Sequence, residues 1–356
     1  MNHSDYKELC GCIHLHTTYS DGGVNYEELI STAQKAQLDY IAVTDHMTLK
    51  GREKGYQGIH DDLIVIIGYE HNDKENKNHY LTFGTSRVMK EATEPQDYIN
   101  KIKEDKGIGF LAHPAEKRNY FGNLPPYPWT EWDAEGYDGI ELWNQMSDWM
   151  EQLKRLRSFV RLFYPRRFMG NIPEELIEKW DKLNLTRFVS GIGGVDAHTK
   201  KMHFGPLSYT IFPIKVELKG VRTHLYCDTA EKKNNSDPGE TILSLLKNGN
   251  GFISNYRKGD ARGSRIFMKD SKGHLISPGY RKGNASTTLP LELSVVIPQK
   301  ADIHLFRNGK RIKVCKSDNT LFTIAQEGVY RVEVYKGSSA WIYSNPFPVG
   351  NYPFLD

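Results

Sequence analysis

Two histidines separated by one residue stand in the stretch IHLHTTYSDG near the start of the chain. His14 and His16 lie in a segment that predicts a β-strand, where alternate side chains leave the same face, so both imidazoles can reach one metal ion. Asp21 follows five residues after His16, where the strand should pass into its loop. Because the chain contains 13 histidines, such a pair also arises by chance, and the interpretation needs support from other segments.

That support comes from a recurring pattern, in which apolar strand segments begin or end in residues of metal-ligand type. The further residues are Asp45 and His46 after YIAVT, Glu70 after LIVIIGY, His79 before YLTFG, His113 after GIGFLA, and Asp196 with His198 after FVSGIGGV. In α/β barrels the active site lies at the carboxyl ends of the strands, so we expect these residues to converge. Convergence favours a metal site.

Seven short apolar segments predict the strands that would carry these residues: GCIHL, YIAVT, LIVIIGY, HYLTFGT, GIGFLAH, DGIELWN and FVSGIGGV. Between the first two, residues 25–40 predict a helix that begins at an Asn25 cap and places apolar residues at helical spacing. Further helices are expected over residues 95–107, 147–163 and 172–184, the last with Asn171 as its cap. Strands that alternate with helices predict a mainly parallel α/β sheet or barrel.

Beyond about residue 216 the pattern changes to loops, one short helix in ETILSLLKNGNG, and strands joined by tight turns. The Asn308-Gly309 pair in HLFRNGKRIKV predicts a β-hairpin. We therefore expect three parts: a barrel over residues 1–215, a connecting segment over 216–284, and a small C-terminal antiparallel β-sandwich over 285–356.

Composition limits the class of protein. A chain of 356 residues that is 38% hydrophobic can bury a core, and 47 Lys and Arg against 44 Asp and Glu do not suit a nucleic-acid scaffold. The sequence has no apolar run of about 18 residues, and the start MNHSDYKELC lacks the features of a signal peptide. Four cysteines are too few for a disulfide framework. We expect a soluble, cytoplasmic protein with no membrane partner.

The groups HLHTTYSDG, TDH, the glutamate of GYE, AHP and DAH also resemble, in order and spacing, the five-part signature of the PHP (polymerase and histidinol phosphatase) metal-dependent phosphoesterases. The resemblance covers about residues 10 to 200. It implies a distorted (β/α)7, TIM-like barrel, which agrees with the seven predicted strands. The ending WIYSNPFPV is similar to the carbaryl-hydrolase-like branch, in which a small β domain follows the barrel.

The resemblance further implies three divalent ions, and the mixed nitrogen and oxygen ligands suit Zn²⁺, Mn²⁺ or Fe²⁺. By the family's roles, His14, His16, Glu70 and Asp196 would hold the first ion, Glu70, His79 and His113 the second, and Asp21, His46 and His198 the third. Glu70, as the bridge, together with Asp21 and His198, is expected to act in catalysis. Water that bridges two ions becomes a hydroxide nucleophile near neutral pH. The positive charge of three divalent ions is twice the negative charge of the three ligand carboxylates. The excess positive charge favours a dianionic phosphate ester.

Three basic residues are candidate substrate contacts. Lys117 and Arg118 follow His113 closely, and Lys200 follows His198, so each can form a phosphate clamp or remain a solvated loop charge. The aromatic and proline-rich segment 119–132 predicts a specificity lid or a hydrophobic cover over the barrel rim. For Asp45, orienting a ligand imidazole and capping a turn stay equally open.

Together these features predict a metal-dependent hydrolase that acts on a small-molecule ester, most readily a phosphomonoester. One alternative keeps the site but cleaves carboxyl esters or carbamates, because a metal-bound hydroxide attacks these bonds too. A second alternative is a non-catalytic metal-binding or carbohydrate-binding protein, and the complete ligand set argues against it. DNA editing is disfavoured by the weak net charge.

Overall fold

The computed structural model describes residues 6–117, 125–151, 169–204, 207–228, 237–270, 273–279 and 289–350. Its contacts divide the chain into two compact units made from interleaved segments. The site unit comprises Gly11–Gly170 and Gly193–Arg222, and the β-rich unit comprises Met1–Cys10, Asn171–Ile192 and Thr223–Asp356. The domain boundaries expected at residues 215 and 285 remain a prediction.

All seven predicted strand segments form strands. They are β1 (Tyr6–Leu15), β2 (Tyr40–Val43), β4 (Leu63–Ile67) continued by β5 (Tyr69–His71), β6 (Tyr80–Phe83), β7 (Ile108–Leu111), β8 (Gly139–Asn144) and β9 (Ser190–Ala197). Neighbours pair in the order β9, β1, β2, β4 with β5, β6, β7, β8. All pairs are parallel except those of β6, which runs antiparallel to β5 and β7. The carboxyl ends of the parallel strands therefore gather at one edge.

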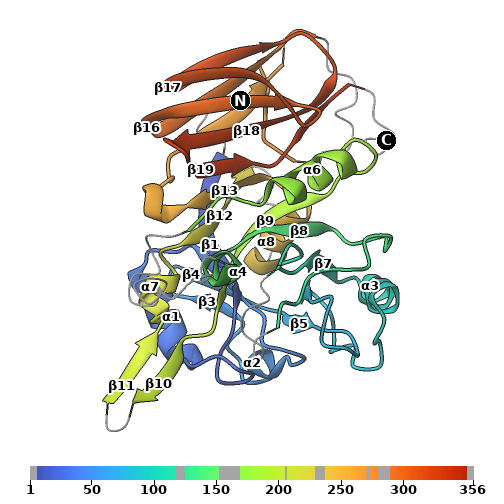
Figure 1. Ribbon diagram of the computed structural model, residues 1–356, viewed down its shortest axis with the longest axis vertical. Helices are drawn as coiled ribbons and strands as arrows, with labels where there is room; N and C mark the ends of the chain where they lie inside the picture. The colour runs from blue at the N-terminus through green and yellow to red at the C-terminus, as the bar shows by residue number, and fades with distance from the viewer. Residues whose placement is uncertain are drawn as a thin grey trace. The chain divides into compact units, whose positions relative to one another are not determined.

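The remaining elements of the site unit are short. They are β3 (Gly58–His60), the two-stranded sheet of β10 (Lys200–Phe204) and β11 (Leu207–Ile211), and the helices α1 (Tyr26–Lys35), α2 (Lys50–Glu53), α3 (Pro95–Glu104), α4 (Gln145–Glu151) and α7 (Ile214–Glu217). In α1 the Asn25 side chain accepts a hydrogen bond from the Glu28 amide, which confirms the predicted cap. The buried residues Tyr26, Leu29, Ile30 and Ala33 form one face. Figure 1 shows α1 beside α7.

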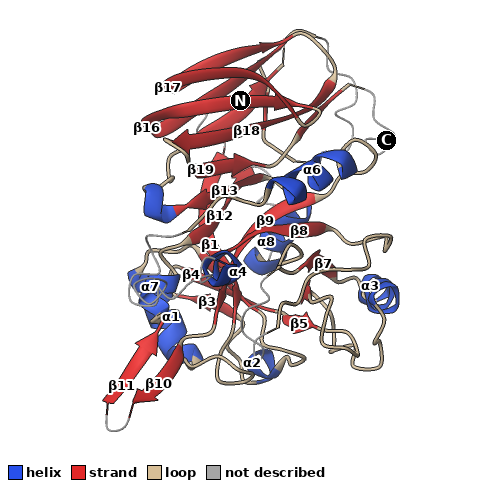
Figure 2. Ribbon diagram, in the orientation of Figure 1, coloured by secondary structure: helices blue, strands red, loops and turns tan. Residues whose placement is uncertain are grey.

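The β-rich unit contains most of the antiparallel strands. Its elements are α6 (Glu174–Leu183), β12 (Val221–Asp228, shared with the site unit), α8 (Pro238–Lys247), β13 (Gly251–Asn255), a 3₁₀ turn (Tyr256–Lys258), β14 (Arg265–Lys269), β15 (Leu275–Ile276), β16 (Leu291–Arg307), β17 (Lys310–Ile324), β18 (Gly328–Lys336), β19 (Ser339–Ser344) and β20 (Phe347–Val349). Figure 2 shows β16, β17, β18 and β19 as neighbouring strands, of which β16 and β17 are the longest, with 17 and 15 residues. They pair in antiparallel register.

The long strand β16 organises this unit. Its first half pairs with β14 and its second half with β18, while β17 follows it along both halves. Alternate residues such as Leu291, Leu293 and Val295 are buried in an apolar core. Asn308 and Gly309 both have positive φ values, 49° and 75°, at the turn into β17. The predicted hairpin is confirmed, because a tight turn of this kind needs residues that tolerate such angles.

Two helix predictions need comment. The helix expected over residues 147–163 is described only as far as Glu151, and the rest lies outside the described residues. The expected cap of α6 is wrong: the helix begins at Glu174 after Pro173, and no side chain caps it. Asn171 instead accepts a hydrogen bond from the Ala340 amide and donates one to the carbonyl of Ser338. Its side chain therefore forms hydrogen bonds with the backbone at the start of strand β19. A spacing rule that considers only neighbouring residues cannot predict this contact.

The structure confirms a mixed α/β fold with many strands and short helices. Among the described residues, no helix is both long and apolar enough to cross a membrane. None of the four cysteines forms a disulfide.

Candidate metal centre

The nine predicted ligand residues come together at the strand ends of the site unit. They fall into four overlapping groups, and within each group the ligand atoms lie within 4.8 Å of one another. The groups are His14, His16 and Glu70; His14, His113 and Asp196; His46, Glu70 and His79; and His16, Asp21, His46 and His198. The predicted convergence therefore occurs, and this cluster of imidazoles and carboxylates can bind metal.

Glu70 lies at the centre of the cluster. Its Oε1 is 2.7 Å from Nδ1 of His79 and 3.1 Å from Nε2 of His113. Its Oε2 is 3.0 Å from Nε2 of His14 and 3.2 Å from Nε2 of His16. Because the two oxygens face two different pairs of imidazoles, this carboxylate is arranged as a bridge between neighbouring ions requires.

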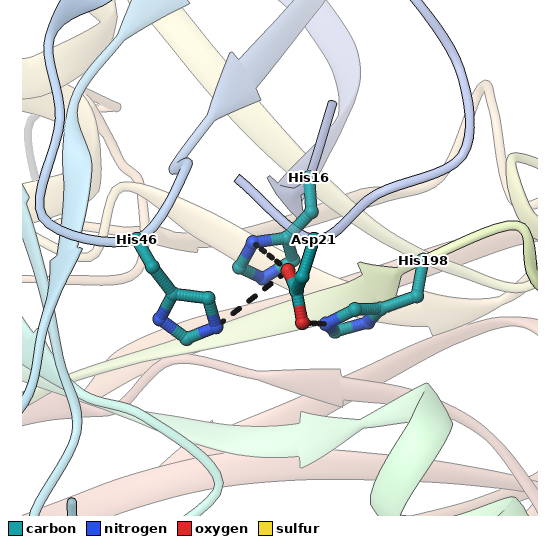
Figure 3. Close-up of side chains that lie close together, drawn as sticks. All are labelled: His16, Asp21, His46 and His198. Atoms are coloured by element: carbon teal, nitrogen blue, oxygen red, sulfur yellow. Dashed lines mark ion pairs between the residues drawn. The ribbon is translucent and has the colours of Figure 1, made fainter. Parts of the chain in front are cut away.

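Asp21 forms the open end of the cluster (Figure 3). Its Oδ2 is 3.1 Å from Nε2 of His198, and its Oδ1 is 3.7 Å from Nδ1 of His16 and 3.8 Å from Nε2 of His46. The side chain of Asp21 is 47% exposed and that of His46 27%, whereas that of His16 is fully buried. Solvent and small molecules therefore reach the cluster at Asp21.

The two buried carboxylates of the cluster are strongly acidic. Burial by itself would raise the pKa of Glu70, but His14, His46 and His79 outweigh it and hold this pKa well below the ordinary value. The pKa of Asp196 is likewise well below its ordinary value despite burial, because His14 and His198 lie close by. Both groups therefore carry negative charge at neutral pH and attract cations.

The imidazoles respond to the same charges. Burial would lower the pKa of His16, yet its contacts with Asp196 and Glu70 raise that pKa to about 9. His46, in contrast, has its pKa lowered to about 4 by burial and by neighbouring His16 and His79, although Glu70 opposes this. A raised pKa favours the protonated imidazole, whose positive charge balances the neighbouring carboxylates. A metal ion can take over that role, since it binds the neutral imidazole and supplies the positive charge.

Unsatisfied atoms support the same interpretation. Nδ1 of His16 and Nε2 of His79 are buried and make no hydrogen bond with the described residues. A buried polar atom without a partner is costly, so such atoms call for a ligand. Six imidazoles and three carboxylates give the mixed nitrogen and oxygen set that Zn²⁺, Mn²⁺ and Fe²⁺ accept. The residues present fit a group of divalent ions.

Asp45 caps a turn and does not contact a ligand imidazole through the bonds described. Its Oδ1 accepts hydrogen bonds from the Thr17 amide at 2.7 Å and from Ser20 Oγ at 2.8 Å. Its Oδ2 accepts from Thr17 Oγ1 at 2.7 Å and from the Tyr26 hydroxyl at 3.3 Å. These bonds hold the loop that carries Asp21. Of the two interpretations left open by the sequence, the structure supports the turn cap.

Sequence reasoning missed two buried acids beside the cluster. Glu141 on β8 lies 2.9 Å from Nδ1 of His14. Glu217 on α7 accepts a hydrogen bond from Thr199 Oγ1 at 2.9 Å, and burial, with the charge of Asp196, raises its pKa well above the ordinary value. The position of Glu141 inside the predicted strand DGIELWN was a signal for this residue, whereas nothing in the sequence around Glu217 indicated its position.

The predicted substrate contacts remain predictions. Lys117 and Lys200 have exposed side chains. The amide of Lys117 donates to Glu151 Oε1 at 2.9 Å, and Lys200 opens strand β10. Arg118 lies outside the described residues.

The segment 119–132 is described from Pro125 onward, and this part covers the cluster. The ring of Tyr127 stacks on that of His79, with 4.9 Å between ring centroids and 15° between planes. The carbonyl of Tyr127 lies 3.2 Å from Nδ1 of His113. Trp129 is buried against Tyr80 and Tyr98. Tyr127 therefore lines the cluster, while Trp129 anchors the segment.

Comparison with known proteins gives one family match. Residues 13–138 match the PHP domain, and this segment contains every cluster residue except Asp196 and His198. An uncharacterised protein of Methanocaldococcus jannaschii is 25% identical over 119 residues, which cover 29% of this chain and 66% of that protein, just under two thirds of its length. Residues 13–138 are therefore similar to the PHP domain, and the carbaryl-hydrolase-like branch remains a hypothesis.

Solved structures give weaker likenesses. A two-domain protein from Bacteroides vulgatus containing a predicted PHP-like metal-dependent phosphoesterase is 13% identical, with a TM-score of 0.45 and 96% of each chain covered. PsfC from Pseudomonas syringae is 12% identical, with a TM-score of 0.37, and the likeness covers 67% of this chain and 96% of that one.

Proposed function

We propose that this chain is a cytoplasmic metal-dependent hydrolase that cleaves phosphomonoesters of small molecules. The observation that carries the proposal is the position of Glu70, whose two oxygens face separate pairs of histidines. A single structural ion would need no such carboxylate. A centre that clamps both the attacking and the leaving oxygen of a phosphoryl group does.

The proposed centre holds three divalent ions, of Zn²⁺, Mn²⁺ or Fe²⁺. By the resemblance to the PHP family, the ligands of the first would be His14, His16, Glu70 and Asp196; of the second Glu70, His79 and His113; and of the third Asp21, His46 and His198. The overlap of the four groups that these nine residues form supports neighbouring ions with shared ligands. Bound ions would supply an activated water and would neutralise the charge that grows on the phosphoryl oxygens. The exposed position of Asp21 supports entry of the substrate beside the third ion.

The chain's own residues would then orient the ester. Tyr127, stacked on His79, offers an aromatic wall for the leaving group. Lys117, Arg118 and Lys200 remain the proposed contacts to the phosphate oxygens. Asp21 and His198, which contact each other at the open end, would face the departing group.

The net charge of the proposed centre supports a dianionic substrate. This support is weaker than a count of the nine ligands alone would suggest. Three divalent ions exceed the charge of Glu70, Asp21 and Asp196, but Glu141 adds a carboxylate that contacts His14. The centre would still carry excess positive charge, and a dianionic phosphomonoester neutralises this charge better than a neutral ester does.

We also propose that the seven strands of the site unit form a distorted (β/α)7 barrel over residues 1–215. A connecting segment, 216–284, and a β-sandwich, 285–356, would follow. The strand order from β9 to β8 supports the barrel. The antiparallel pairing of β16 with β14, β17 and β18 supports the sandwich.

The experiment that tests the reaction is a substrate panel with protein reconstituted separately with Zn²⁺, Mn²⁺ and Fe²⁺. We expect release of inorganic phosphate from aryl and nucleoside monophosphates, with inorganic phosphate as a competitive inhibitor. Turnover of neutral aryl esters or carbamates, without phosphatase activity under any of the three ions, would replace the proposed bond with a carboxyl-ester or carbamate bond.

A further inference from the structure

Strand β8 contains none of the nine ligand residues, but two of its side chains contact three of them. Glu141 lies in the middle of β8 and Asn144 is its last residue, and both are buried, with exposed fractions of 1% and 6%. A buried carboxylate and a buried amide must have partners to offset the loss of water. The partners of these two side chains belong to the metal cluster.

Glu141 uses each of its oxygens on a different ligand residue. Oε1 lies 2.9 Å from Nδ1 of His14, and Oε2 accepts a hydrogen bond from the backbone amide of His113 at 2.7 Å. Because a carboxylate only accepts hydrogen bonds, Nδ1 of His14 must carry the hydrogen. This leaves Nε2 of His14 to face Glu70 at 3.0 Å, on the side where a metal ion would bind.

Asn144 extends the same contact to a third ligand. Its Nδ2 donates to Glu141 Oε2 at 2.9 Å and to Asp196 Oδ2 at 3.3 Å. The amide of Ser147 donates to Asn144 Oδ1 at 2.8 Å, which fixes the orientation of the side-chain amide. One pair of side chains on β8 therefore contacts His14, His113 and Asp196.

These three ligand residues share an unusual backbone conformation. Their φ values are 63° for His14, 29° for His113 and 55° for Asp196, all in the left-handed region that residues with a side chain rarely adopt. Such conformations persist only where the surrounding structure holds them. The contacts of Glu141 and Asn144 converge on these positions.

Gly194 shows how closely this arrangement is fitted. A Cβ atom at Gly194 would lie 1.7 Å from Oε1 of Glu141, much nearer than any other atom, and its φ value is not in the positive range. Alanine at this position would therefore displace the Glu141 carboxylate without straining its own backbone. The glycine makes room for the bond between Glu141 and His14.

We propose that Glu141 and Asn144 are positioning residues that hold His14, His113 and Asp196 in the geometry needed to bind metal. This role rests on the proposed function, because it assumes that the cluster holds divalent ions. Neither residue contacts the substrate in this account. Their effect is exerted on the affinity for the ions.

The test measures Zn²⁺ binding alone, by calorimetric titration against a competing chelator, in wild type, Glu141→Gln and Gly194→Ala. Gln has the size of Glu but cannot accept hydrogen bonds at both of its terminal atoms. Ala at position 194 leaves the Glu141 carboxylate in place chemically but displaces it. Loss of such a partner costs about 10- to 100-fold in metal affinity. We expect this loss at the tightest site in both variants.

Glu333→Gln is the matched control, because Glu333 is also buried and bonded but lies in the β-rich unit beside Arg331 and Tyr335. It should leave Zn²⁺ affinity unchanged. In the Zn²⁺-loaded wild type we further expect a protected Nδ1 proton resonance of His14 in the NMR spectrum, which Glu141→Gln should abolish. General loosening of the fold would not remove this one signal selectively.

Wild-type Zn²⁺ affinity in a folded Glu141→Gln variant would overturn the proposal. If that variant does not fold, wild-type affinity in Gly194→Ala overturns it instead. A wild-type chain that binds Zn²⁺ but releases no phosphate from any monoester contradicts the proposed reaction and leaves the role of Glu141 intact.

Discussion

The carboxylate of Asp21 meets the imidazole of His198 at 3.1 Å, between Oδ2 and Nε2, and its side chain is the most exposed of the nine cluster residues. Asp21 lies in the loop after β1, and His198 directly follows β9. The contact therefore joins two ligands that are distant in the sequence, at the side of the cluster that is open to solvent.

Asp21→Asn should therefore remove the third ion selectively. The amide lacks the negative charge that a cation needs, whereas the buried ligands around Glu70 are unchanged. Elemental analysis should show about one ion fewer per chain than in wild type. Asp61→Asn, at an exposed carboxylate bonded to Gln34, should leave the metal content unchanged. Equal metal content in Asp21→Asn and wild type would exclude Asp21 as a ligand.

Glu70→Gln should reduce phosphate release by at least about 100-fold with the fold intact, because the variant loses both the charge and one bridging oxygen. Steady-state rates at saturating metal give the measurement, and circular dichroism monitors the fold. His304→Ala, in the β-rich unit, serves as the control and should leave the rate of phosphate release nearly unchanged. Near-wild-type turnover in Glu70→Gln would show that the bridge lies elsewhere.

Most of the cluster was predictable from the sequence because its residues lie at the ends of predicted strands or in the adjoining loops. His14, His16 and His113 lie in or next to apolar runs, and parallel strands bring such ends together. Glu141 was not assigned. It lies in the middle of the predicted strand DGIELWN, and its partners are a ring nitrogen and a backbone amide that are distant in the sequence. Spacing along the chain does not encode such contacts.

The fold was predictable to a similar depth. Seven strand segments and the Asn25 cap follow from local patterns that the structure repeats. Asn171 fails as a cap because strand β19, far along the chain, offers its side chain two backbone partners. The interleaving of the two units escapes prediction for the same reason, since it depends on long-range contacts.

Tyr127→Leu should weaken recognition of aromatic leaving groups. The stacked ring of Tyr127 beside His79 is expected to contribute a roughly 3- to 10-fold effect on KM for an aryl phosphate. An alkyl phosphate has no ring to stack, so its KM should stay at the wild-type value. A parallel loss for both substrates would mean that Tyr127 supports His79 and does not contact the substrate.

Stability should depend on pH through His224 in the β-rich unit. Nδ1 of His224 lies 2.7 Å from Glu8 Oε1, and Arg265 pairs with the other oxygen of Glu8. Burial would lower the pKa of His224, but the Cys10 sulfur and the Glu8 carboxylate outweigh it and raise this pKa to about 9. The interaction of protonated His224 with Glu8 therefore stabilises the fold fully below about pH 6.5. This stabilisation is lost as the pH rises toward 9, because His224 then loses its proton.

Glu8→Gln should accordingly destabilise the protein on the order of 1–3 kcal/mol at pH 6, and less at pH 9.5, where His224 is neutral in both proteins. Urea unfolding followed by tryptophan fluorescence at the two pH values measures the difference. Glu292→Gln, at an exposed position of β16, is the control. A difference that does not change with pH would exclude the charged pair.

The number of ions that each chain binds distinguishes a shared metal centre from a single metal site. We predict that wild-type protein, reconstituted with Zn²⁺ or Mn²⁺ and freed of loosely bound metal, approaches about three ions per chain by elemental analysis, since the nine residues form four overlapping ligand groups, two of which contain Glu70. Saturation at a single ion would contradict it, because one ion leaves the second oxygen of Glu70 and the histidines that face it without a role.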